Sequence, residues 1–154
     1  MSFDFAAVDT LMANVTSHAQ RLAIFETVHT HEPKSAPGAG MHYCVWVQSI
    51  EPIHTSGLSS TSGRVEVTGR IYSSFIQKPE EDIDPNILSA EATLLNEYTS
   101  DFNFGGTLRM LDLLGAYGSP LSAKSGYVDI DRKVYRVMTT VIPLIFNDMF
   151  TQTP

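Results

Sequence analysis

The sequence has a single cysteine, no long hydrophobic run and, between residues 79 and 108, no basic side chain. Because Cys44 is the only cysteine, no disulfide within the chain is available. Cys44 lies in the apolar stretch from Tyr43 to Val47, which is typical of a small buried side chain rather than of a nucleophile. We therefore expect the chain to fold without oxidation.

No apolar run is long enough to cross a membrane. The longest, residues 141–146, contains Pro143, whereas a spanning helix needs about 20 apolar residues. Residues 1–15 contain Asp4 and Asp9 but no Lys or Arg, so they lack the basic start of an export signal. A formal net charge of −7 argues against sequence-independent binding of nucleic acid, which depends on Lys and Arg. We expect a soluble protein with no membrane partner.

The acidic excess is concentrated in residues 79–108. Residues 1–78 carry a formal charge of −1 and residues 109–154 carry +1, so this block carries the whole excess. Its acids are Glu80, Glu81, Asp82, Asp84, Glu91, Glu97 and Asp101. One interpretation is a solvated helix face that maintains solubility. The other is a surface that repels a polyanion or receives a basic partner.

Hydrophobic periodicity predicts two main helices. In the first, apolar residues recur at steps of three and four: Phe5, Val8, Met12, Val15, Ala19 and Leu22. The second is expected from about Pro85 to Thr99, because Asp84 supplies a capping carboxylate and proline suits the first helical position. Its predicted apolar face is Ile87, Leu88, Leu94, Leu95 and Tyr98. The acids of this helix are expected mainly on the opposite side.

The rest of the chain predicts strands. A short strand is expected at residues 25–28, longer ones at 43–50 and 64–76, and others at 108–114, 126–130 and 134–142. Asp131-Arg132-Lys133 indicates a hairpin, and Pro143 demotes residues 143–146 to an edge strand or a bulged continuation. The order predicts one α+β domain over residues 1–154: a mostly antiparallel sheet with both helices packed on one face. Mobile loops are expected at about 31–41 and 55–63.

Residues that could carry chemistry are sparse. His29 and His31 fall on one side of an extended segment. A metal site there would draw on His29, His31, Glu32, His42 and His54. Solvated loop histidines are the alternative, and Asp129 with Asp131 fits a hairpin tip of mixed charge. The sequence contains no phosphate-binding glycine loop and no nucleophile elbow. The residues therefore predict no enzyme, no metal and no cofactor.

An ordered set of short segments nevertheless carries a family resemblance. Its first half is Phe25-x-x-Val28, Glu32-Pro33-Lys34, Val45-Trp46-Val47, Ser56-Gly57-Leu58 and Arg70-Ile71. Its second half is Asp84-Pro85, residues 112–118, Gly126-Tyr127, Tyr135-Arg136-Val137, Val141-Ile142-Pro143 and Asn147-Asp148. None of these segments is a catalytic motif. Across nearly its whole length, the chain resembles the tail terminator proteins of long-tailed bacteriophages with non-contractile tails, especially those that infect actinobacteria.

The resemblance implies a ring, usually a hexamer, at the head–tail junction of a virion assembled in the bacterial cytoplasm. The ring would cap the tail tube, end its polymerisation and dock to head-completion or stopper proteins, while DNA passes through without specific binding. The candidate acidic surface is Glu80, Glu81, Asp82, Glu91, Glu97 and Asp101, which either lines the channel or faces a basic patch on the tail-tube protein. The candidate assembly loops contain Glu32, Pro33, Lys34, Ser56, Gly57 and Leu58.

Two alternatives stay open at this point. The chain could be another neck or head-completion protein on the portal side. It could instead be a small metal-dependent hydrolase that uses His29, His31 and nearby carboxylates.

Overall fold

A computed structural model describes residues 2–55, 59–74, 83–101, 103–104, 106 and 108–151. In chain order, its elements are β1 (Ser2–Phe3), α1 (Phe5–Arg21), β2 (Thr27–His29), β3 (Met41–Thr55), β4 (Ser60–Ser74), α2 (Ile83–Ser100), β5 (Met110–Leu111), β6 (Ser122–Ile130) and β7 (Lys133–Thr151). The strands form one sheet in the order β1-β7-β4-β3-β2, and β5 and β6 also pair with β7. Every pairing is antiparallel except that of β2 with β3. The predicted α+β class is confirmed.

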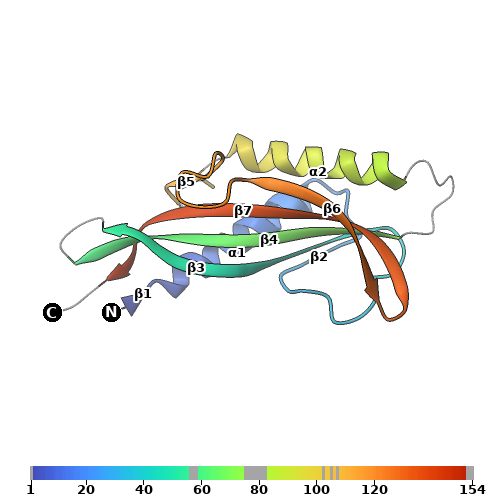
Figure 1. The fold of residues 1–154 in the computed structure, drawn as a ribbon, viewed down its shortest axis with the longest axis horizontal. Helices are drawn as coiled ribbons and strands as arrows, with labels where there is room; N and C mark the ends of the chain where they lie inside the picture. Colours follow the sequence, from blue (N-terminus) through green and yellow to red (C-terminus); the bar gives the residue numbers. More distant parts are fainter. Residues whose placement is uncertain are drawn as a thin grey trace.

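Both helices contribute to one core. Leu11 of α1 and Leu94 of α2 are fully buried in the same cluster as Val67 of β4 and Ile142 of β7. In Figure 1, α1 passes behind the sheet, and α2 runs lengthwise beside β6 and β7. Among the described residues, no helix combines the length and apolar character required to cross a bilayer.

A smaller cluster lies outside this core. It consists of Cys44, Tyr72, Tyr135 and Val137, with Trp46 and Ala36 packed against it. Burial raises the pKa of the Cys44 thiol to about 11, although Arg70 nearby acts in the opposite direction. The prediction that Cys44 is a buried apolar side chain is confirmed.

The helix faces differ in detail from the predicted ones. The buried stripe of α1 includes Leu11 and His18, so it is rotated about the helix axis relative to the predicted stripe. As a result, Phe5 is 70% exposed. In α2 the buried stripe includes Ile87. Leu88 is exposed because successive side chains on a helix point about 100° apart around its axis.

The start of α2 also differs from the prediction. Asp84 lies in the first turn rather than before it, and its Oδ1 accepts a hydrogen bond from Arg136 Nε at 2.8 Å. The carboxylate therefore ties the start of α2 to β7.

Of the two structures predicted for residues 143–146, the edge strand is wrong, and the continuation is present but without a bulge at Pro143. β7 pairs with β4 on both sides of Pro143, so this proline lies inside a long central strand. The Pro143 carbonyl accepts from Asp112 N at 2.9 Å, so its nitrogen faces the same side of the strand. On that side β5 ends at Leu111, opposite Leu144, and β6 begins at Ser122, opposite Val141. The missing N–H thus falls in the gap between two short partners.

The predicted hairpin around residues 131–133 is confirmed. Ile130 pairs with Lys133, which leaves Asp131 and Arg132 as a two-residue turn with φ of 52° and 64°. Positive φ at both positions is typical of a type I′ turn, whose twist matches the flanking strands. The predicted loop 55–63 is shorter than expected, because Thr55 already pairs with Thr61 in the β3–β4 hairpin.

Candidate functional site

The predicted acidic surface does not stay together as one exposed face. Three of its residues, Glu80, Glu81 and Asp82, lie outside the described residues. The other three, Glu91, Glu97 and Asp101, belong to α2 or directly follow it, and each has a partner within the subunit. Their local contacts therefore decide how much charge they present.

The assignment of Glu91 to the exposed acidic surface is wrong. Its side chain is only 2% exposed, because it lies on the same stripe of α2 as Ile87 and Leu94. Glu91 Oε1 accepts a hydrogen bond from Thr140 Oγ1 of β7 at 2.5 Å, whereas Oε2 is buried without a hydrogen-bond partner. Burial raises the pKa of this carboxyl, and the hydrogen bond from Thr140 offsets part of the effect.

A pair of buried phenols lies in the same core. Tyr43 of β3 and Tyr98 of α2 have hydroxyl oxygens 3.1 Å apart, and Tyr98 donates to the Val15 carbonyl of α1 at 3.3 Å. Burial raises the pKa of both phenols, so both remain neutral. Gly69 makes room for them, since a Cβ there would lie 2.1 Å from the Tyr43 hydroxyl. The hydrogen bonds connect the sheet to both helices.

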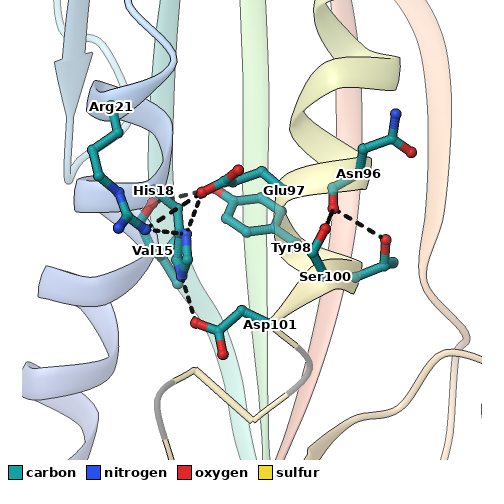
Figure 2. Close-up of polar contacts among 9 residues, drawn as sticks. Val15, His18, Arg21, Asn96, Glu97, Tyr98, Ser100 and Asp101 are labelled. Carbon is teal, nitrogen blue, oxygen red and sulfur yellow. Dashed lines mark hydrogen bonds and ion pairs between the residues drawn. The ribbon is translucent and has the colours of Figure 1, made fainter.

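Glu97 and Asp101 meet a buried histidine of α1, as Figure 2 shows. His18 Nδ1 lies 2.8 Å from Glu97 Oε1, and His18 Nε2 lies 3.0 Å from Asp101 Oδ2. Arg21 Nη2 lies 2.6 Å from His18 Nδ1 and 3.4 Å from Glu97 Oε1. We call these four residues the α1–α2 clamp.

The clamp follows from helix spacing. Residues 97 and 101 are four apart and share a face, while residues 18 and 21 are three apart on the last turn of α1. An imidazole donates to both carboxylates only when it carries two protons, whereas a neutral ring can accept from Arg21 at Nδ1. Either arrangement offsets acidic charge within the subunit, so Glu97 and Asp101 are not free carboxylates. No sequence pattern singles out His18 beyond its position beside the apolar stripe.

The connector between β2 and β3 lies against the β6–β7 hairpin rather than apart from it. Ala36 N donates to Asp131 Oδ2 at 2.9 Å, and Gly38 N donates to the Tyr135 hydroxyl at 3.2 Å. Glu32 Oε1 lies 3.9 Å from Arg70 Nη1 of β4. These contacts join the stretch that contains the predicted residues Glu32, Pro33 and Lys34 to β4 and the β6–β7 hairpin. The mobility expected for this loop stays a prediction. The other predicted assembly residues, Ser56, Gly57 and Leu58, lie outside the described residues.

The histidines of the proposed metal site are dispersed. The rings of His29 and His31 have centroids 5.2 Å apart, but His42 bonds to Thr27 and to the Ala39 carbonyl. The His54 ring lies elsewhere, tilted against the Tyr117 ring with centroids 5.6 Å apart. Within the described part of the chain, no three His, Cys, Asp or Glu side chains gather as metal ligands would.

The feature that the sequence analysis missed is a pair of exposed leucines after β5. Residues 108–114 were expected to form a strand, but β5 contains only Met110 and Leu111. Leu113 is 51% exposed and Leu114 is 89% exposed. The preceding Asp112 and the following glycine at 115 are turn residues, and this signal could have identified the turn.

Comparison with known proteins identifies no family. No family model matches the sequence, and a search of curated proteins returns no significant match. The fold and contacts define an α+β protein whose acidic helix is partly neutralised by its own partners and whose exposed apolar side chains lie outside the core.

Proposed function

We propose that this chain is a structural virion protein of the tail terminator class. Copies would close into a ring, usually of six, that caps the tail tube, ends its polymerisation and docks to head-completion proteins. The proposal rests on the ordered segments that resemble this family and on an α+β fold of the kind that the resemblance implies.

One observation carries the proposal: several large apolar side chains are exposed on one subunit, and two of them are adjacent in the chain. Leu113 and Leu114 follow β5, whereas Leu88 and Tyr127 lie on α2 and β6. Figure 1 shows that β5 lies towards the last turn of α2 and that the β6–β7 hairpin lies towards its first turn. Contiguous exposed apolar patches mark interaction sites, and the adjacent leucines are where we propose one. When two different patches meet between copies, the contact is head-to-tail, and it gives a ring when the rotation between copies closes.

The charge distribution supports passage of DNA without binding. A channel surface of carboxylates offers DNA phosphates no cations, so no counterions are released by contact. Glu91 is buried, and Glu97 and Asp101 belong to the α1–α2 clamp. We therefore assign the channel surface to the remaining candidate acids, Glu80, Glu81 and Asp82. The competing interpretation is that these acids face a basic patch on the tail-tube protein.

Tail length in a virus that lacks this gene tests the proposal. Loss of a terminator is expected to give abnormally long tubes. Tubes of normal length that fail to join capsids would refute the proposal and favour a head-completion protein on the portal side. Turnover of a substrate by the purified chain would also count against a structural role.

Charge reversal distinguishes the two roles of the acidic block. Substitution of Glu80, Glu81 and Asp82 by Lys leaves the buried Glu91 and the clamp intact. If the block lines the channel, tails are expected to keep their length while DNA ejection fails; overlong tails would indicate the tube interface instead. The matched control is Asp9→Lys, an exposed acid on α1 outside the block, which is expected to change neither property.

A further inference from the structure

The sheet carries two separate apolar clusters, because successive side chains of a strand point to opposite faces. Tyr43 of β3 and Ile71 of β4 are paired, and both pack with the two helices in the main core. Their chain neighbours Cys44 and Tyr72 point to the other face and belong to the smaller cluster. Among the described residues, none from either helix contributes to that cluster. Its cover is therefore not a helix.

The connector between β2 and β3, residues 31–40, covers the smaller cluster instead. Ala36 of the connector packs against it. Burial raises the pKa of the Cys44 thiol, and the Glu32 carboxylate of the connector adds to this effect, so the connector also runs close to the thiol. Cys44 is only 1% exposed beneath this cover.

Few contacts hold the connector in place. Within the part of the chain that the structure describes, residues 31–40 take part in no backbone–backbone hydrogen bond. Apart from Pro33, Ala36 and Pro37, its residues are exposed. Its polar attachments run through side chains of other elements: Ala36 N to Asp131 at 2.9 Å, Gly38 N to the Tyr135 hydroxyl at 3.2 Å, the Ala39 carbonyl to His42 at 2.8 Å, and Glu32 to Arg70 at 3.9 Å. A segment of this kind opens locally at low free energy.

Two cavities flank the connector near Ala39. One, of about 480 Å³, lies between this part of the connector and Tyr135 and Lys133 of the β6–β7 hairpin. The other, of about 460 Å³, lies between Ala39 and Asn86 of α2. A Cβ at Gly38 would meet no atom within 4 Å, and φ of 97° there favours glycine. The connector therefore loses little packing when this stretch moves away.

We propose that the connector is a hinged cover, which opens while the helices and the sheet stay folded and thereby exposes the smaller cluster. Its two ends are held by β2 and β3, which pair with each other and remain in place. Because the smaller cluster is separate from the main core, its exposure leaves the packing of both helices intact. The subunit thus has an apolar surface that is available only in the open state. This inference does not depend on the proposed ring.

Labelling of Cys44 tests the opening directly, since Cys44 is the only cysteine. The full chain is treated with the thiol reagent DTNB under native conditions over a series of urea concentrations. The free energy of opening follows from the labelling rate relative to that of the unfolded chain. We expect labelling much faster than global unfolding allows, with a urea slope that is a small fraction of the unfolding slope, because the slope follows the surface exposed. A free energy and a slope equal to those of unfolding would overturn the proposal.

A matched pair of turn variants tests the first attachment. Asp131→Gly removes the acceptor of Ala36 N but keeps a residue that tolerates the φ of 52° at this position. It is expected to raise the rate of Cys44 labelling about 2- to 10-fold, the effect of one lost hydrogen bond. Arg132→Gly makes the same change at the next residue, whose φ is 64°, and should leave the rate unchanged. Equal rates in the two variants would contradict a cover held by Asp131.

A second pair separates local opening from general destabilisation. Tyr135→Phe removes the acceptor of Gly38 N, whereas Ile142→Val trims a buried side chain of the main core. Each is expected to lower the ratio of folded to unfolded protein about 2- to 10-fold. Only Tyr135→Phe should accelerate the labelling of Cys44 at low urea, by a similar factor. If Ile142→Val accelerates it equally, Cys44 is reached by global unfolding and the hinged cover is refuted.

Discussion

Replacement of Glu91 by Gln is expected to stabilise the protein at neutral pH. Burial raises the pKa of Glu91 in the folded state above its unfolded value, so the folded state binds more protons between those two values. Stability is therefore highest below the unfolded pKa of 4.5 and falls as pH rises through the folded pKa. Gln keeps the acceptor for Thr140 and carries no charge at any pH.

The size of the effect follows from the buried, unpartnered oxygen of this carboxyl. Leaving such a group unsatisfied costs about 1 to 3 kcal/mol when it is neutral and more when it is charged. Gln still places a neutral amide nitrogen there, so Glu91→Gln recovers only the part of the cost that comes from the charge. It should increase the free energy of unfolding at pH 7 by about 1 kcal/mol, a rise in melting temperature of roughly 2 to 4 °C for a chain of this size. Below the unfolded pKa the two proteins should converge.

The assay is urea denaturation followed by circular dichroism over a pH series. Thr140→Val is the informative companion: it removes the hydrogen bond that lowers the Glu91 pKa, so it should destabilise the protein and extend the pH-dependent range upward. Asp9→Asn serves as the control at an exposed carboxylate on α1. If wild type and Glu91→Gln give parallel stability curves across the series, the reasoning about the buried carboxyl is refuted.

Three further substitutions test other parts of the fold by the same denaturation assay. His18→Leu removes the partner of two carboxylates and should cost about 1 to 3 kcal/mol, with partial recovery when Glu97→Gln is added; an additive double variant would contradict the clamp. Gly69→Ala should cost about 1 to 3 kcal/mol because its Cβ meets the Tyr43 hydroxyl, and less in a Tyr43→Phe background. Arg132→Gly should stabilise the β6–β7 turn by about 1 kcal/mol, since φ there is 64°; a loss of stability would indicate that the arginine side chain contributes more than the strain it carries.

Much of the fold could be predicted because it depends on local patterns. The periodicity of residues 5–22 located α1, and the alternation around Asp131 and Arg132 located the β6–β7 hairpin. The prediction for Pro143 failed because the cost of its missing backbone N–H depends on whether its nitrogen faces a paired strand. No strand pairs there because β5 ends at Leu111 and β6 begins only at Ser122.

The candidate site was less predictable because burial and pairing are set by distant elements. Glu91 looks like its acidic neighbours in the sequence, but the rotation of α2 places it over Thr140. The exposure of Leu114 is likewise invisible in an apolar run, since it depends on the anchoring of the loop by Asp112 and Arg64.

The sequence by itself determined the α+β class, both helices, the hairpin turn and the concentration of acidic charge, because each of these depends on residues close together in the chain. Tertiary structure alone decided which acids are buried or paired and which apolar side chains remain in solvent. The physical reason is that desolvation and pairing energies depend on what lies opposite a side chain, and His18 faces groups 79 and 83 residues away.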